Sequence, residues 1–122
     1  MNALLDGIPD LAWVKDDHSR FIAVNQTLAN ACSSSLSEMI GKTDFDFFPS
    51  DLAESYRLDD LQVMETGRMK KIEEKFINKS GVETWIESIK VPVINELGEV
   101  TGTAAIARDV THRKVTEAVL QK

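Results

Sequence analysis

The second half of the chain contains three long runs rich in β-branched residues, and these runs restrict the fold more than any other feature. They span residues 70–77, 82–93 and 100–110. The segments between them, residues 78–81 and 95–98, each begin with Asn and end with Gly. Short Asn- and Gly-containing segments between such runs are typical of β-hairpins. We therefore expect three consecutive antiparallel strands.

The first half supplies two shorter strands and then helices. Residues 11–14 and 21–24 are apolar runs on either side of a polar turn, which predicts a hairpin. Three helices are expected next. The first spans residues 26–31, and the second begins with a capping box formed by Ser35 and Glu38. The third has Ser50 as its N-cap and continues to about Gly67. This order predicts an α+β domain with a five-stranded antiparallel sheet, short helices on one face and a C-terminal helix.

The size and charge of the chain limit its function. Its 122 residues suffice for one domain with a buried core. Its net charge of −6 repels phosphate backbones and anionic lipids, so we expect neither nucleic-acid binding nor membrane contact by this segment. No apolar run approaches the roughly 18 residues that span a bilayer, and no secretory signal is recognisable, which predicts a cytoplasmic domain.

Residues suited to catalysis or metal binding do not form a recognisable group in the sequence. His18 and His112 stand in a predicted turn and at the start of the C-terminal tail. Asp44 and Asp46 are close in sequence, but without a nearby His or third carboxylate we assign them capping and turn roles. The single cysteine, Cys32, is read as a small buried apolar residue. We therefore predict no catalytic residue and no metal ligand, as in a regulatory module rather than an enzyme.

Short motifs follow one another along nearly the whole chain. Asn25 comes after the second strand, and Trp85 stands in the central one of the three long strands. The other motifs are residues 41–49 (GKTDFDFFP), 65–67 (ETG), 79–81 (KSG), 90–92 (KVP), 98–102 (GEVTG) and 109–114 (DVTHRK). In this order the motifs resemble bacterial PAS sensor domains of the PAS/PAC type, and the last of them is similar to the Asp-Ile-Thr motif that precedes a signalling helix.

The resemblance implies a single PAS domain over residues 1–122. Residues 1–10 would form an N-terminal helix or cap, residues 11–110 the PAS core, and residues 111–122 the start of a signalling helix. PAS domains sense a small molecule or dimerise, and pass a signal to an attached output domain such as a diguanylate cyclase or the histidine kinase of a two-component system. The implied partners are a second copy in a homodimer and the protein's own C-terminal effector domain. The alternative is a ligand-free PAS domain that only mediates protein interaction.

The same resemblance limits the cofactor. PAS domains that form a flavin adduct carry a reactive cysteine in the segment that here spans residues 42–47, which has none. Haem-binding PAS domains commonly supply a histidine from the long helix, and residues 50–67 contain none. Both features argue against a covalent flavin adduct and against haem. Non-covalent flavin stays open, and the implied ligand is an unknown small molecule.

Alternation along the middle long strand predicts which residues meet that ligand. Successive side chains of a strand face opposite ways, so Ile86, Ser88 and Lys90 share one face. By resemblance this face points to the helices and a pocket. On the long helix, Tyr56 and Asp60 lie on one stripe with Leu52 and Met64.

The predicted ligand-binding set therefore shares one covered face and consists of Lys90, Ser88, Ile86, Asp60 and Tyr56. A buried ammonium needs a counter-charge, which either Asp60 or a small polar or anionic ligand would supply to Lys90. A structural ion pair, or a Lys90 side chain that extends to the edge of the sheet, is the alternative.

The opposite face and the end of the last strand carry two further hypotheses. Trp85, Ile89 and Val91 form an apolar strip, which we expect the N-terminal helix or a second subunit to cover, unless the residues are simply exposed singly. By resemblance, the signal-relay residues are Asp109, Thr111 and Arg113. Asp109 would bond to nearby amides or to Arg113, and the alternative for it is an ordinary helix cap.

Overall fold

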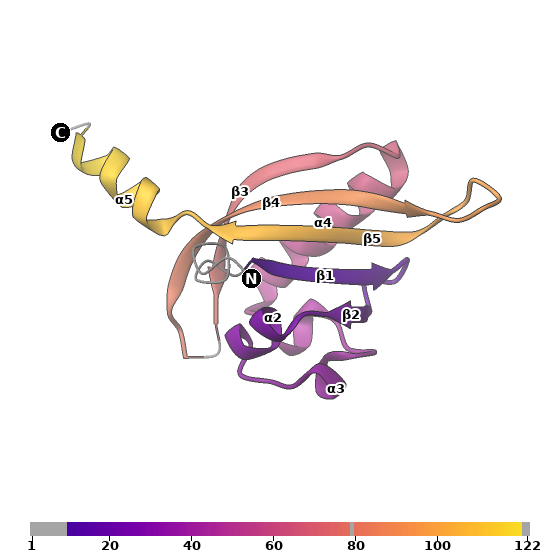
Figure 1. Ribbon diagram of the computed structural model, residues 1–122, viewed down its shortest axis with the longest axis horizontal. Coiled ribbons are helices and arrows are strands. Elements are labelled where there is room, and N and C mark those ends of the chain that lie inside the picture. Colours follow the sequence, from indigo (N-terminus) through magenta and orange to yellow (C-terminus); the bar gives the residue numbers. More distant parts are fainter. Residues whose placement is uncertain (1–9, 79, 121–122) are drawn as a thin grey trace, which may run out of the picture.

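The computed structural model describes residues 10–78 and 80–120, and it contains one five-stranded antiparallel sheet. The strands stand in the order β2-β1-β5-β4-β3, with every neighbouring pair antiparallel (Figure 1). Their bounds are β1 Leu11–Asp16, β2 Phe21–Val24, β3 Lys70–Ile77, β4 Glu83–Ile94 and β5 Val100–Asp109. The predicted fold class is confirmed, and β5 is the central strand, with β1 and β4 on either side of it.

Two hairpins connect the long strands where the sequence predicts them. Gly81 and Gly98 have positive φ angles of 81° and 80°, which glycine adopts without a steric penalty. In the first hairpin the Asn78 side chain accepts hydrogen bonds from the backbone N–H groups of Ser80 and Val82. Asn95 makes the equivalent bonds in the second hairpin. The Asn side chains therefore satisfy the turn amides that the strands leave free.

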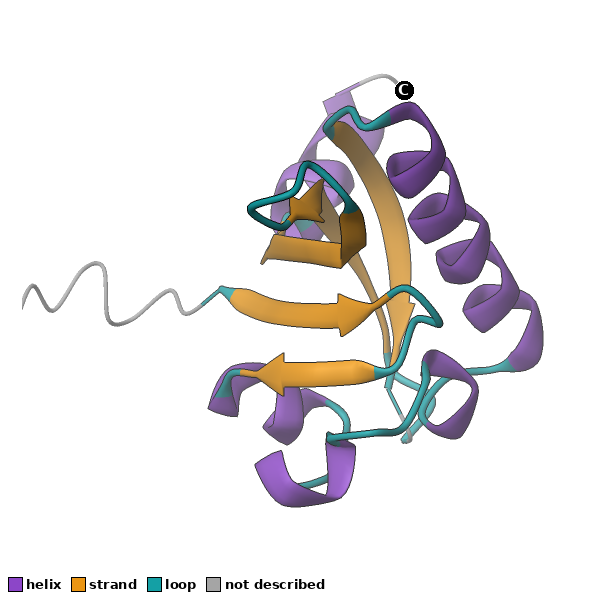
Figure 2. Cartoon of the chain, turned by 90° about the vertical axis from the view of Figure 1, so that its right-hand side faces the viewer, coloured by secondary structure: helices purple, strands orange, loops and turns teal. Residues whose placement is uncertain are grey.

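Helices cover one face of the sheet (Figures 1 and 2). Asn25 caps the first by accepting a hydrogen bond from the Leu28 N–H, and Ser35 caps the second by accepting one from the Glu38 N–H. The long helix begins after Pro49, so Ser50 is its first residue and not its cap, contrary to the prediction. These elements are α2 Gln26–Ala31, α3 Leu36–Met39, the 3-10 turn η1 Asp44–Asp46 and α4 Ser50–Thr66.

The chain ends in helix α5, Thr111–Leu120, which extends away from the sheet (Figure 1). The N-terminal helix or cap expected over residues 1–10 lies almost entirely outside the described residues. Within residues 10–78 and 80–120, no helix combines the length and the apolar character needed to cross a bilayer.

The hydrophobic core lies between α2, α4 and the covered face of the sheet. Phe48 packs edge-to-face against Tyr56 and Phe76, with ring centroids 5.2 and 5.1 Å apart, a favourable geometry for aromatic pairs. The core also contains Leu28 and Met39, whose side chains are almost completely buried. Cys32 lies in this core, as predicted.

Strand β4 shows the alternation that the sequence predicts. Ile86, Ser88 and Lys90 are buried beneath the helices, with Ser88 and Lys90 only 0% and 2% exposed. Trp85 and Ile89 are half-buried on the opposite face, and Val91 is 36% exposed there. The covered face of the sheet therefore carries buried polar groups at its centre.

Candidate functional site

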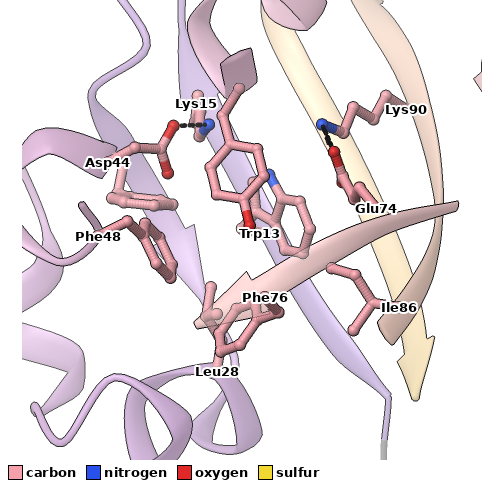
Figure 3. A pocket seen from close by; sticks show the side chains of 11 residues that line it. Trp13, Lys15, Leu28, Asp44, Phe48, Glu74, Phe76, Ile86 and Lys90 are labelled. Carbon is pink, nitrogen blue, oxygen red and sulfur yellow. Dashed lines mark hydrogen bonds and ion pairs between the residues drawn. The ribbon is translucent and has the colours of Figure 1, made fainter. Parts of the chain in front are cut away.

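A small cavity lies between α4 and the covered face of the sheet. Its walls include the aromatic side chains of Trp13, Phe48, Tyr56 and Phe76. Two ion pairs complete the lining, Lys15–Asp44 and Lys90–Glu74, and Figure 3 shows them on opposite sides of Trp13. The volume that the centre of a water molecule can occupy in this cavity is about 20 Å³, which is enough for roughly one water.

Lys90 reaches this cavity from β4 and has two carboxylate partners. Its Nζ atom lies 3.0 Å from Asp59 and 3.1 Å from Glu74, and 5.1 Å from the centre of the Tyr56 ring. Asp59 also accepts a hydrogen bond from Lys70 at 2.7 Å. The predicted pairing of Lys90 with Asp60 is therefore wrong. Both aspartates are buried on α4, but Asp59 points to the β4 side and Asp60 to the β1 side.

Lys15 forms the matching centre on the other side of the cavity. Its Nζ atom lies 2.5 Å from Asp44 and 3.0 Å from Asp60, and the lysine is 3% exposed. Asp60 also accepts a hydrogen bond from Ser19 at 2.7 Å, and the Ser19 hydroxyl accepts one from Arg57 at 2.7 Å. The buried charges therefore belong to two clusters, each built from the sheet and α4.

Sequence reasoning missed Lys15 and Asp44. We ended the first strand's apolar run at residue 14 and assigned Asp44 only capping and turn roles, whereas β1 continues to Asp16 and Asp44 is buried against Lys15. Extending the alternation from Leu11 through Trp13 to Lys15 would have placed the lysine on the covered face. No local pattern pairs it with Asp44, which is 29 residues away.

Burial shifts the titration of the carboxyl groups that line the cavity. Desolvation raises the pKa of both Asp44 and Glu74, and the neighbouring lysines offset this only in part. For Asp59, hydrogen bonding to Lys70 and the charge of Lys90 outweigh the effect of burial, so its pKa is lowered. Burial alone would lower the pKa of Lys15, but Asp44 and Asp60 outweigh it, so the pKa is raised. Lys15 thus stays charged, while Asp44 and Glu74 take up protons more readily than exposed carboxyl groups do.

Three of the five predicted ligand-binding residues line the cavity, namely Lys90, Tyr56 and Ile86. The Tyr56 hydroxyl is already engaged, since it donates a hydrogen bond to the Lys75 carbonyl at 2.6 Å. Ser88 lies behind the lining and donates a hydrogen bond to Glu74 at 2.7 Å. Asp60 likewise lies behind the lining, bonded to Lys15. These two residues position the charged side chains and do not face the cavity themselves.

A second hollow lies next to the cavity, between α2 and the end of the β3–β4 hairpin. The volume that the centres of water molecules can occupy in this second hollow is about 210 Å³. Its lining includes Leu11, Ala31 and Val82. Phe76 and Ile86 line both spaces. Phe76 and Ile86 therefore belong to a wall that the smaller inner cavity shares with the larger outer groove.

The predicted relay residues connect α5 to the sheet. Asp109 accepts a hydrogen bond from the Thr111 N–H at 2.8 Å, and the Thr111 hydroxyl accepts one from the Trp85 N–H at 2.8 Å. Arg113 does not pair with Asp109, contrary to one of the predicted alternatives. It binds Glu73 on β3 and lies 3.7 Å from Glu87 on β4.

Trp85 is partly covered by α5. The Lys114 ammonium lies 5.0 Å from the centre of the indole ring and 2.9 Å from Glu73. Lys75, on β3, has its ammonium 5.7 Å from the centre of the same Trp85 ring. We expected the N-terminal helix or a second subunit to cover Trp85. Within the described residues, these two lysines cover part of its ring.

Comparison with known proteins identifies relatives along almost the whole chain. The family described as the PAS fold matches residues 5–115. The "Methanogenesis regulatory histidine kinase FilI" of Methanothrix harundinacea is 30% identical over 98% of this chain and 13% of its own length. A "Diguanylate cyclase" of Vibrio cholerae is 30% identical over 81% of this chain and 32% of its own length. The chain thus spans less than a third of the length of these curated relatives.

Solved structures agree with the fold. A structure of "VqmA bound to DPO" has a TM-score of 0.75 and is 26% identical, covering 83% of this chain and 52% of that one. A structure of the Vibrio cholerae VqmA dimer has a TM-score of 0.78 at 26% identity, covering 86% of this chain and 48% of that one. The shared region is about half of VqmA.

Proposed function

Because the chain belongs to the PAS family, we propose that it is the sensory and dimerising module of a bacterial signal-transduction protein. In this role it binds a small polar molecule in the cavity beside Lys90 and relays binding through α5 to an attached output domain. One observation carries the proposal: two buried lysine–carboxylate pairs face the same aromatic-lined cavity. Well-packed apolar residues are often as stabilising as a buried ion pair, so charges at this position suit recognition better than stability.

Binding requires the cavity to open. Pockets that bury small molecules measure about 300–1,000 Å³, whereas this cavity has room for roughly one water. Phe76 and Ile86 line both this cavity and the outer groove of about 210 Å³. Rotation of the Phe76 ring would join the two spaces, so we assign it the role of a gate between α2 and the β3–β4 hairpin.

The relay follows from the two faces of strand β3. Glu74 faces the cavity and bonds to Lys90 and Ser88, while its neighbour Glu73 faces outward and binds Arg113. Because β3 is an edge strand with β4 as its sheet neighbour, a ligand that moves Glu74 also moves Glu73 and the start of α5. Asp109 and Thr111 keep that start joined to β4.

The whole protein would extend beyond the sensory module. Residues 1–10 would form the N-terminal cap, residues 11–110 the PAS core and residues 111–122 the start of the signalling helix. A histidine kinase or a diguanylate cyclase is the proposed output, since FilI and the Vibrio cholerae relative carry those names. We assign the module to the cytoplasm.

A homodimer would form through the uncovered face of the sheet. Trp85, Ile89 and Val91 lie there, and Ile106, which pairs with Ile89 across the strands, is 46% exposed. Apolar residues grouped on one face are typical of contact surfaces. The VqmA dimer gives a precedent for self-association in a protein with this fold.

A ligand-free interaction domain is the second candidate. The small size of the inner cavity favours this candidate. The pairing of both lysines favours it as well, because carboxylates already neutralise their charges without a ligand. In that case the buried clusters would serve only to fix the position of α4 on the sheet.

A titration distinguishes the two candidates. A low-molecular-mass extract of bacterial cytosol is added to ¹⁵N-labelled protein, and backbone amide shifts are recorded. The sensory function predicts shifts at Ser88, Lys90 and Glu74 that Lys90→Ala abolishes. Lys71→Ala is the matched control, since Lys71 is exposed on the other face of β3. Equal shifts in both variants would remove Lys90 from the binding site, and no shifts in the wild type would favour the ligand-free domain.

A further inference from the structure

The charges that face the cavity balance each other. Lys15 and Asp44 line one side, and Lys90 and Glu74 line the other. The remaining two carboxylates have cations of their own on the side away from the cavity. Asp59 binds Lys70 at 2.7 Å, and Asp60 is linked through the Ser19 hydroxyl to Arg57. The lining is therefore neutral before any ligand enters.

A charged ligand would upset this balance. An anion between the two pairs would stand beside Asp44 and Glu74, and a cation would stand beside Lys15 and Lys90. Placing an uncompensated charge in a buried site is costly, because its hydration is lost and no counter-ion replaces it. Desolvation already raises the pKa of Asp44 and Glu74, in line with a site that resists additional negative charge.

A neutral polar ligand can use both pairs without disturbing them. Each ammonium has three N–H groups and donates to two carboxylates, which leaves one donor for a ligand. A carboxylate has more acceptor sites than these bonds use, so either side can bind a group that both accepts and donates. Between the pairs the walls include aromatic rings, among them Trp13, Phe48 and Tyr56. Such walls suit a flat apolar body that is stacked or met edge-on.

From this arrangement we infer that the cavity, once it has opened towards the outer groove, selects an uncharged, flat aromatic molecule that both donates and accepts hydrogen bonds, and rejects anions and cations of the same shape. This inference rests on the proposed function, because it names the class of ligand for the same site. The sequence predicted a small polar or anionic ligand, and this inference restricts the predicted class to neutral polar molecules.

Three probes of nearly equal shape test the charge preference: benzamide, benzoate and benzamidine, which are neutral, negative and positive. Binding is measured by calorimetry at about pH 8, where all three keep these charges and exposed carboxyl groups are ionised. The wild type should bind benzamide at least about tenfold more tightly than either ion.

Removing one cavity carboxylate should shift the preference. Glu74→Gln leaves Lys90 in excess, so benzoate should bind at least about tenfold more tightly than to the wild type. Asp44→Asn should act in the same way from the other side. Glu73→Gln is the matched control, because it removes the same charge from the neighbouring residue on the opposite face and should leave the preference unchanged.

The outcomes separate this inference from the proposed function. Tighter binding of benzoate or benzamidine than of benzamide by the wild type overturns the inference and leaves a small-molecule sensor in place. An equal shift in Glu73→Gln and Glu74→Gln also overturns it. If none of the probes binds while the cytosolic extract still shifts Lys90, only the inference fails. If neither the probes nor the extract act on the cavity, both fail.

Discussion

Each face of the sheet carries a group of side chains that its surroundings do not normally favour. The face beneath the helices carries Lys15, Glu74, Ser88 and Lys90 at its centre. The open face carries an apolar strip that includes Ile89. In most antiparallel sheets with one covered face, the apolar side chains are covered and the polar ones meet water.

These two exceptions, buried charges on one face and exposed apolar residues on the other, differ in what they do to stability. Buried charges are tolerated only where partners compensate them, so the covered face gives up stability to keep polar groups around a cavity. Exposed apolar residues on the other face gain stability only when another surface covers them. In the proposed function, the covered face binds a small molecule and the open face binds a second copy of the protein.

The largest effect should come from the covered face. Lys90→Met leaves Asp59 and Glu74 without their shared cation, and removing one partner of a buried pair costs about 3–5 kcal/mol. Lys71→Met removes a cation from the open face of β3 and should change the free energy of unfolding by less than about 0.5 kcal/mol. Urea denaturation of the two variants measures the difference. Similar losses in both would contradict the contrast between the faces.

The open face should respond in association rather than in stability. Ile89→Glu places a charge in the proposed interface and should weaken dimerisation at least about tenfold, or about 1.4 kcal/mol. Val82→Glu serves as a control, since Val82 is 54% exposed at the end of the β3–β4 hairpin and outside this strip. Sedimentation equilibrium gives the dissociation constants. A wild-type protein that stays monomeric at high concentration would exclude the homodimer.

The junction between the sheet and α5 should affect signalling more than folding. Asp109→Ala removes the acceptor for the Thr111 N–H and should cost about 1 kcal/mol of stability. In a fusion of the chain to a histidine kinase, the same change should reduce the response of autophosphorylation to the cytosolic extract. Asp109→Asn keeps an acceptor and should retain most of that response. Equal responses from both variants and the wild type would remove Asp109 from the relay.

The smallest effect concerns pH. Burial raises the pKa of Glu74 above 4.5, so the folded protein binds this proton more tightly than the unfolded chain. Its contribution to stability is therefore complete below pH 4.5 and is lost as the pH rises through the folded pKa. The free energy of unfolding of the wild type, minus that of Glu74→Gln, should increase from about pH 7 to about pH 5.

Urea denaturation of both proteins across this range measures the difference. Asp59 has a lowered pKa, so its own contribution is lost only below 3.8 and does not mask the trend. A difference that stays constant or decreases towards pH 5 would mean that Glu74 is not held in a desolvated site.

The sequence was sufficient to predict the strands, the hairpins and that Ser88 and Lys90 share one face, while the resemblance to PAS domains supplied that this face is the covered one. Strand alternation has a period of two, so one correctly placed residue orients all the others. Helix α2 was predicted with its bounds, Gln26–Ala31, since the segment is short and enclosed by clear signals. The order of the strands in the sheet was not predicted, because it depends on contacts between distant segments.

The charged clusters depend on such contacts and were predicted only in part. Asp59 and Asp60 are neighbours on α4, and which of them meets Lys90 depends on how the helix lies across the sheet. Lys15 and Asp44 approach each other across 29 residues of sequence. The size of the cavity depends on the rotamers of rings such as Phe76, which a sequence pattern does not specify.

Native mass spectrometry tests most directly whether the covered face is a binding site. The chain is purified gently from bacterial cytosol and compared with Glu74→Gln and with Glu73→Gln. Our account predicts that the wild type and Glu73→Gln carry the same non-covalent small-molecule adduct, and that Glu74→Gln has lost it or exchanged it for another. A bare polypeptide mass for the wild type, or an identical adduct on all three proteins, would contradict it.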